Sequence, residues 1–587
     1  MFNRWQNWVD DRTGWKATAR RWKNRPVPSQ GRIWHALGFA LASTLLVEFV
    51  TGVLISLVYS PSTASAWGSV YYLSNHVDLG WLIRGIHRFG SYASVILGGL
   101  WLGRLVFTGL YRAPREFTWW LAVAIVGLIL VLGVTGNILP WDQRGYWAAV
   151  VETTIAGGLP VVGAWLRRLI VGGSEFGNTT LTRIHALHVV VLPGLLIALG
   201  WLRVRLLRRI EDRVEQQTDR RLEPFWPKSA FVDLALASAV LAVVAGFAVA
   251  RHGYSLDAPA DASSDDYPAR PEWYFLPLYQ LLRVFQGREI IATVVLPTVV
   301  MVGLLVLPLL DRVVSRRLTR IAAGTFFLTL AACSGFLTYQ ALAKDTHSDA
   351  FQAARVRAND LARRATILAD LDGVPAEGSG YLLKLDPTTR GAELFSKKCQ
   401  SCHNYDGSKG DEQWAPALAH YGSRPWIRGL LEKPDSPDYY GKAPQCGGMT
   451  EWKESSTLDA KQLDAVADYV ALMAKTPPDM TPGEWLDEPG NKNHPGRASY
   501  QAECAQCHTF GDPSVRDKKL QPAPDMFAWG SDRWTSRMIR RPGHPSLYGY
   551  LEDEQKMPAY GSQLTESDLS MVVRYLKDGP RSGRVKP

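Results

Sequence analysis

Seven long apolar runs within the first 343 residues constrain this chain more than any other feature. Each approaches the roughly 20 residues that a helix needs to cross the hydrocarbon core of a bilayer. A backbone inside a bilayer must satisfy its own hydrogen bonds, so these runs predict membrane-spanning helices. The runs cover residues 33–58, 90–107, 119–139, 184–207, 230–250, 290–310 and 321–342.

Basic residues gather beside the ends of these runs, and their distribution predicts how the chain lies in the membrane. They cluster before the first run, between the second and third, after the fourth, and between the sixth and seventh. Lysine and arginine collect on the cytoplasmic side of membrane proteins, so we expect a cytoplasmic N-terminus and an outward-facing C-terminal region. The net charge of +10 therefore reflects topology in membrane lipid, and it does not indicate a nucleic-acid partner.

The polar region after the last run carries the pattern Cys-x-x-Cys-His twice. This pattern is typical of covalent haem attachment, in which two thiols bond the porphyrin edge and the histidine ligates the iron. A zinc site or a redox Cys-x-x-Cys pair is the alternative, and the adjacent histidine and the repetition favour haem c. Bacteria attach such haems outside the cytoplasmic membrane, which agrees with the charge distribution. The motifs are Cys399, Cys402 and His403, and Cys504, Cys507 and His508.

The segment GAELFSKKCQSCH (391–403) resembles the opening helix of small monohaem cytochromes c, and this resemblance implies a methionine in a later loop as the sixth ligand. In the first module Met449 is the best-placed candidate, and Met473 on the following apolar run is expected to pack. In the second module Met557 stands before a proline and is the expected ligand. The alternatives there are Met526, Met538 and Met571.

Two histidines lie in apolar segments of helix length: His87 in residues 80–104, which extend the second run, and His188 in the fourth run. An ionisable residue in such a segment is a functional-site hypothesis by default. Facing each other in a helix bundle, they could hold a haem iron from both sides. An interval of fourteen residues, nearly four helical turns and about 21 Å of rise, recurs in three runs. It predicts two stacked haem levels, although ordinary packing of small residues is the alternative. The pairs are Gly38 and Gly52, Trp101 and His87, and Ala122 and Gly136.

These residues resemble cytochrome b of quinol:cytochrome c oxidoreductases, in particular its shorter b6 form followed by subunit IV. The resembling segments are GWLIRGIHR (80–88), PREFTW (114–119), GVTGNILPWDQRGYWA (133–148), LTRIHALHVVVLP (181–193) and PEWYFLPLYQLLR (271–283). The resemblance implies a mainly α fold: a seven-helix transmembrane bundle followed by two small all-α cytochrome c domains.

The expected domains follow from this resemblance and from the two haem-attachment motifs. They are a basic arm at 1–32, a four-helix haem bundle at 33–210, a three-helix region at 211–343, a connector at 344–385, a first cytochrome c domain at 386–476, a linker at 477–493 and a second cytochrome c domain at 494–587.

The resemblance also implies roles for particular residues. His87 and His188 would ligate a haem at the outer level, beside Gly52 and Gly136. Glu272 of the PEWY segment would accept a proton from quinol, which a carboxylate at the membrane boundary suits. The remaining implied residues are Tyr274 in the quinol pocket, and Arg84 and Arg88 as partners of haem propionates.

The inner level departs from the family pattern. A second histidine pair would fall at Trp101 and at Arg203 or its neighbour Leu202. Indole offers only an N–H donor and guanidinium stays protonated, so neither gives iron a lone pair. The expected inner glycine is replaced by Ala122. We therefore expect no inner b haem, with Trp101 filling part of its volume.

The b6 form also attaches a further inner haem through one cysteine, and Ala36 stands at the matching position. His35 is the one candidate that could support an inner iron as a lone ligand. The expected cofactors are thus one haem b and two haems c.

The function that the resemblance implies is quinol oxidation at the outer face of a bacterial cytoplasmic membrane, within a multisubunit complex. Electrons would pass through one b haem and two c haems to a soluble cytochrome c or a terminal oxidase. The chain has no Cys-x-His and Cys-x-x-His pair, so a Rieske-type iron–sulfur protein would be separate. A homodimer is expected. Without an inner haem, a conventional Q cycle is not.

Two alternatives remain open from sequence. The bundle could act as a structural and relay subunit that anchors the dihaem region without oxidising quinol. The chain could also run a full Q cycle with an unusually ligated inner haem.

Overall fold

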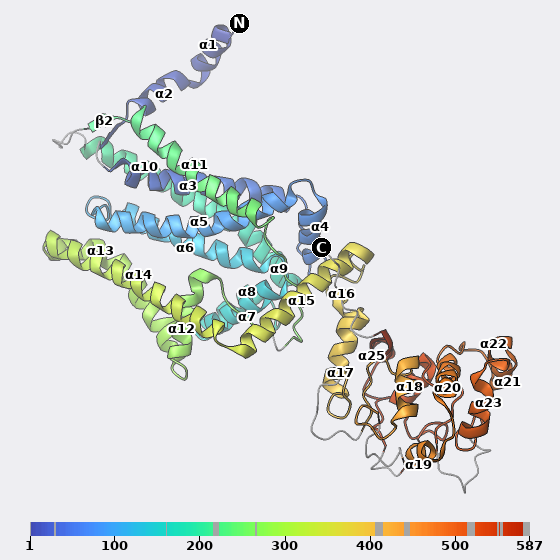
Figure 1. Ribbon diagram of the computed structural model, residues 1–587. Coiled ribbons are helices and arrows are strands. Elements are labelled where there is room, and N and C mark those ends of the chain that lie inside the picture. The colour runs from blue at the N-terminus through green and yellow to red at the C-terminus, as the bar shows by residue number, and fades with distance from the viewer. Residues whose placement is uncertain are drawn as a thin grey trace. The chain divides into compact units, whose positions relative to one another are not determined.

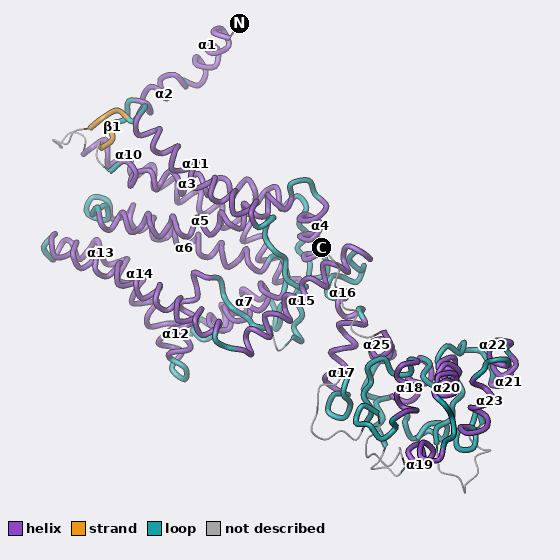
Figure 2. The backbone as a smooth tube through the Cα atoms, in the orientation of Figure 1, coloured by secondary structure: helices purple, strands orange, loops and turns teal. Residues whose placement is uncertain are grey.

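The computed structural model describes residues 2–28, 31–159, 161–214, 222–264, 267–405, 415–439, 447–512, 523–548, 551 and 556–578. The chain forms two compact units, residues 1–380 and 381–587. Helices dominate both units (Figure 2). The expectation of a mainly α fold is confirmed.

Seven helical segments of the first unit are long and apolar enough to cross a membrane, which confirms the seven predicted spans. The second begins ten residues earlier than its apolar run, because polar residues such as Arg84 and Arg88 continue the helix. The segments are α3 (Arg32–Ser56), α5 (Gly80–Phe107), α6 (Glu116–Ile138), Asn178–Ile210, α11 (Lys228–Ala250), Ile291–Val313 and α14 (Arg316–Thr346).

A wider π-helical turn interrupts one of these spans and begins another. The fourth consists of α9 (Asn178–Ala186), η1 (Leu187–Val191) and α10 (Leu192–Val214). The sixth consists of η4 (Ile291–Val295) and α13 (Leu296–Val313). Turns of this kind are frequent at functional sites, and η1 carries His188.

Short elements complete the first unit. Two three-residue strands pair antiparallel, with Pro26 opposite Pro224. The elements are α1 (Phe2–Thr13), α2 (Trp15–Lys23), β1 (Pro26–Pro28), α4 (Ala66–His76), α7 (Gln143–Gly157), α8 (Gly163–Val171), β2 (Leu222–Pro224), η3 (Trp273–Phe275), α12 (Leu276–Val284) and α15 (Asp349–Asp372).

Helices α3, α5, α6 and α11 lie side by side and form the bundle that positions the site (Figure 1). One buried cluster joins α3, α5 and α6 around Leu37, Leu97, Trp101 and Ala122. Burial of apolar side chains contributes about 25 cal/mol per Å². This cluster therefore fixes the helix faces at the level of Trp101.

The second unit consists of short helices around two buried clusters. Its elements are α16 (Tyr381–Lys384), η5 (Pro387–Gly391), α17 (Ala392–Lys398), α18 (Arg424–Glu432), α19 (Gly447–Ser455), α20 (Ala460–Met473), α21 (Pro482–Asp487), α22 (Pro489–Lys492), α23 (Gly496–Ser499), η7 (Tyr500–Cys504), α24 (Asp532–Arg540) and α25 (Glu566–Asp578). Serine caps begin α18 and α24 at equivalent places, since Ser423 and Ser531 accept hydrogen bonds from Trp426 and Trp534.

Candidate functional site

The structure brings His87 and His188 together at one level of the bundle. His87 lies on α5 and His188 on η1, with ring centroids 6.3 Å apart and an interplanar angle of 79°. The Nδ1 atom of each ring is within hydrogen-bond distance of a hydroxyl, 3.0 Å from Thr51 and 2.9 Å from Thr135. A histidine whose Nδ1 is held in this way presents Nε2 to a metal.

Gly52 and Gly136 directly follow these two threonines and leave room for the histidine rings. A Cβ atom at Gly52 would lie 3.2 Å from Cε1 of His87, and one at Gly136 would lie 2.7 Å from Cε1 of His188. Both distances are shorter than a relaxed carbon–carbon contact, so larger residues would displace the rings. The outer level therefore fits a haem b held by two imidazoles.

The inner level is occupied by side chains that contact one another. Trp101 is 6% exposed, and a Cβ atom at Gly38 would lie 3.3 Å from its indole nitrogen. The guanidinium of Arg203 lies 4.5 Å from the Trp101 ring centroid, a cation–π distance. Arg203 also donates to the backbone carbonyl of Thr118 at 3.1 Å, and Ala122 is fully buried.

His35, the lone candidate for an inner ligand, is exposed at the start of α3. Its Nδ1 lies 2.8 Å from the backbone carbonyl oxygen of Gly31, within the same helical turn. Its neighbour Ala36 is fully buried.

Glu272 is a buried carboxylate, 8% exposed, directly before η3. One of its oxygens accepts a hydrogen bond from Arg88 and the other accepts one from the Tyr92 hydroxyl at 2.8 Å. Arg88 directly follows His87 in α5. A buried ion pair costs several kcal/mol when one partner is removed, so Arg88 and Glu272 hold each other in place.

The hydroxyl of Tyr254 extends this network. Arg144 donates to it at 2.7 Å, and Nη2 of Arg88 lies 3.4 Å from it. Arg84 donates to the backbone carbonyl of the same tyrosine. Both arginines predicted as partners of propionates thus contact protein groups in the structure, one turn apart on α5.

Glu152 on α7 is a second buried carboxyl group of the site. Its Oε1 has no hydrogen-bond partner within the described part of the chain. Burial, and then the charge of Glu272, raise the pKa of Glu152 to about 8. A carboxyl group with such a pKa is suited to receive and pass on a proton near neutral pH.

Tyr274, which the sequence placed in the pocket, packs against Gly133 of α6.

Sequence reasoning missed several members of this site. Tyr92, Arg144, Glu152 and Tyr254 were not singled out as site residues, although Arg144 lies within the resembling segment 133–148. Glu48 did carry a signal, because it is a carboxylate inside an apolar run. In the structure its Oε2 lies 3.3 Å from Nδ1 of His87.

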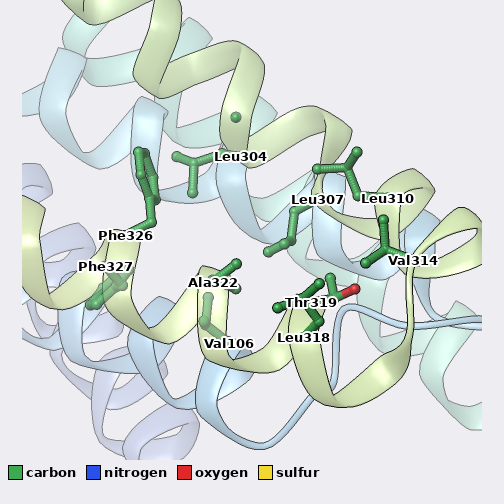
Figure 3. A pocket seen from close by; sticks show the side chains of 12 residues that line it. Val106, Leu304, Leu307, Leu310, Val314, Leu318, Thr319, Ala322, Phe326 and Phe327 are labelled. Carbon is green, nitrogen blue, oxygen red and sulfur yellow. The ribbon is translucent and has the colours of Figure 1, made fainter.

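A separate apolar pocket lies between α13 and α14 (Figure 3). Leu304, Leu307 and Leu310 line it from α13, and Phe326 faces them from α14. Apart from Thr319, the lining side chains are apolar and carry no group for redox or acid–base chemistry. The pocket suits a hydrocarbon chain, and the chemistry belongs to the site around Glu272.

Both Cys-x-x-Cys-His motifs have the same local geometry in the second unit. None of their four cysteines forms a disulfide within the described part of the chain, so each can form a thioether bond. Nδ1 of His403 lies 2.9 Å from the carbonyl oxygen of Pro416, and Nδ1 of His508 lies 3.0 Å from that of Pro524. Each ring thus presents Nε2 to an iron, and the motifs fit haem c.

The methionines are distributed differently from the sequence-based pairing, which put Met449 with His403 and Met557 with His508. In the structure Met449 lines a cavity with Cys504, Cys507 and His508. Met557 packs against the buried cluster that adjoins Cys399. Among the alternatives, Met473 and Met571 are buried in helix interfaces.

Comparisons with protein families match four segments of the chain. Residues 22–211 match the family described as cytochrome b/b6/petB, and residues 259–356 match cytochrome b(C-terminal)/b6/petD. Residues 388–473 match cytochrome c, and residues 491–576 match cytochrome C oxidase, cbb3-type, subunit III.

Individual proteins give the same result. Cytochrome b6 of Synechococcus elongatus is 36% identical over 203 residues, which cover 35% of this chain and 94% of that protein. Cytochrome b6 of Mastigocladus laminosus is also 36% identical over 203 residues, with 35% and 94% covered. Among solved structures, a chain of a "Hyperthermophilic respiratory Complex III" shares the fold, with a TM-score of 0.51, 23% identity, and coverage of 63% of this chain and 98% of that one.

Proposed function

Because the chain belongs to the cytochrome b/b6 family and continues into cytochrome c segments, we propose that it oxidises quinol with one b haem and two c haems. As a cytochrome b–cytochrome c fusion with seven spanning helices, it is a multi-pass electron-transfer subunit of a bc-type complex.

One observation carries the proposal: the buried carboxylate of Glu272 pairs with Arg88, the residue after His87. A proton acceptor and a haem ligand are thereby joined through adjacent residues of α5. Bound haem supplies one-electron redox chemistry at His87 and His188, and covalent haem supplies it at His403 and His508. A structural anchor has no need of a buried acid at this position.

Quinol oxidation releases two protons, and the site holds two carboxyl groups. Glu272 accepts hydrogen bonds from Arg88 and Tyr92, and it becomes the proton acceptor once quinol displaces one of these partners. Glu152, with a pKa of about 8, exchanges protons near neutral pH and suits the onward transfer. Tyr274, which packs against Gly133 of α6, would form part of the quinol pocket.

The contacts of the inner level support a single b haem. Trp101 fills the space against Gly38, and Arg203 covers the other side of its ring. Neither side chain offers a lone pair to iron. The usual inward path for the second electron is then missing, and a conventional Q cycle does not operate.

The remaining parts of the proposal follow the family. The cytochrome c segments lie on the outer side of a bacterial cytoplasmic membrane, as the basic segments indicate. A separate Rieske-type protein would take one electron from quinol, and the haem that His87 and His188 would hold would take the other. A soluble cytochrome c or a terminal oxidase would receive electrons from the c haems. The complex is a homodimer in lipid.

The variant Glu272→Gln tests the catalytic role. An amide cannot accept the proton, so we expect quinol-driven reduction of the c haems to slow by about 100-fold or more. The measurement is stopped-flow reduction of the purified complex by a soluble quinol. Glu175→Gln, which changes an exposed acid, is the matched control and retains the full rate. Unchanged turnover in Glu272→Gln would instead support the structural and relay role.

A further inference from the structure

Each cytochrome c segment packs the helices before its haem-attachment motif against the last helix of the other segment. The helices before the first motif, η5 and α17, contact α25 at the far end of the second segment. The helices before the second motif, α23 and η7, pack against and beside α20 at the end of the first segment. Figure 1 shows α17 near α25 and α20 near α23.

Two glycines at equivalent positions lie where each attachment helix contacts the last helix of the other segment. Gly391 lies eight residues before Cys399, and Gly496 lies eight residues before Cys504. A Cβ atom at Gly391 would lie 2.5 Å from the carbonyl oxygen of Met571 in α25. A Cβ atom at Gly496 would collide with the backbone of α20. Glycine is needed at both positions because two helix backbones approach closely.

Polar contacts follow the same combination. On the first motif, Arg390 donates to Asp568 of α25 at 2.9 Å, and the backbone carbonyl of Lys398 accepts from Tyr560 at 2.8 Å. On the second motif, Glu503 accepts from the indole nitrogen of Trp452 at 2.9 Å. Each attachment helix is therefore bonded to residues of the other segment.

The chain crosses over where two glycines meet. Gly422 and Gly530 both have positive φ, 76° and 73°, and a Cβ atom at Gly422 would lie 3.5 Å from Cα of Gly530. Each is followed by the serine that caps the next helix. The first segment passes from its own motif to the second motif at this point, and the second segment passes the other way.

The two candidate ligands, Met449 and Met557, lie C-terminal to the glycines at which the chain crosses over. Met557 packs against the cluster formed by Leu394 and Phe395 of the first motif with Leu569 of α25. Met449 faces the cavity that contains Cys504 and His508.

Met526 also lines this cavity, but its position corresponds to that of Leu418 at the first motif. Each stands two residues after the proline whose carbonyl contacts the histidine, and each backbone N–H bonds to the residue after that histidine, at 2.9 Å. Met526 therefore belongs to the histidine side and packs there, as Leu418 does. Met449 therefore remains as the candidate ligand on the side of the cavity opposite His508.

We propose that the two cytochrome c segments exchange their C-terminal halves within one chain, so that one haem iron is ligated by His403 and Met557 and the other by His508 and Met449. This inference rests on the proposed haem attachment and adds the ligand pairing. Exchange of identical elements is a low-cost rearrangement between duplicated units. It makes the two haems part of one interlaced body.

A spectral label on one haem tests the pairing in the full chain. In Cys399→Ala the first haem keeps one thioether bond and one conjugated vinyl group, which shifts its ferrous α-band to longer wavelength. In this background Met557→Ala is expected to remove the sharp shifted band and leave the other intact. Met449→Ala is expected to do the reverse. The opposite assignment would overturn the crossed pairing.

Two further variants distinguish the loss of an axial ligand from misfolding of the domain. Met557→His keeps six-coordinate iron, and it is expected to lower the reduction potential of the shifted haem only, because methionine ligation raises the potential. Met526→Leu, which reproduces Leu418, leaves both bands sharp. Loss of the unshifted band in Met526→Leu, with its retention in Met449→Ala, would overturn the proposal. A haemochrome count on the same samples separates failed haem attachment, which would refute the proposed function, from wrong pairing.

Discussion

Replacing His188 by leucine is expected to abolish b-type haem absorbance completely while both c haems remain. Leucine has no lone pair, so an iron at the outer level would lose one of its two axial ligands. The proposed c haems would be bonded to thiols in a separate unit, so their retention would not depend on the bundle. The measurement is a pyridine haemochrome spectrum of the purified variant.

His185→Leu is the control, because His185 lies about one turn earlier in the same span. Its ring stacks on Tyr59, with centroids 5.2 Å apart, whereas the ring that lies 6.3 Å from His87 is that of His188. We expect this variant to retain its b haem. Persistence of b haem in His188→Leu, or its loss in His185→Leu alone, would contradict the assignment of the outer level.

Replacing Trp101 by alanine is expected to destabilise the bundle by about 3–5 kcal/mol. The indole is buried between Gly38 and the guanidinium of Arg203, so truncation leaves a cavity and removes the cation–π contact. We expect a lower thermal unfolding midpoint, measured by circular dichroism in detergent, with b-haem content unchanged.

Trp201→Ala provides the comparison, since this tryptophan is 63% exposed and its truncation leaves no cavity. Its midpoint is expected to stay close to that of the parent protein. A haem content that changes in Trp101→Ala, or an unchanged midpoint, would show that Trp101 does not fill the inner level.

The bundle could be predicted from sequence because its signals are local. Apolar runs of helix length give the seven spans, and the fourteen-residue interval places Gly52, His87 and Gly136 at a common level. His188 joins them through the family resemblance and its position in an apolar run. The structure brings these four residues together, and it buries Trp101 at the other level.

The acid–base network could not be predicted in the same way. Arg88 was assigned to a propionate because of its position near His87, whereas its contact with Glu272 joins residues 184 positions apart. Glu152 acquires its raised pKa only from burial and from the nearby Glu272. Such properties depend on tertiary packing, which residue spacing does not contain.

The crossed pairing of the methionines illustrates the same limit. Two similar segments predict two similar modules, and each attachment helix could pack against either α20 or α25. Both choices bury the same kinds of apolar side chains. The order of the segments in the sequence therefore does not determine which attachment helix packs against which C-terminal helix. The choice becomes visible only in contacts such as Arg390 with Asp568 and Trp452 with Glu503.

The central claim is that this cytochrome b carries a single b haem beside two c haems. A pyridine haemochrome assay on the purified chain measures both types in one sample, because acidified acetone extracts haem b and leaves haem c attached. We predict one b haem for every two c haems. A ratio of two to two would contradict the claim, since it would require a second b haem at the level of Trp101.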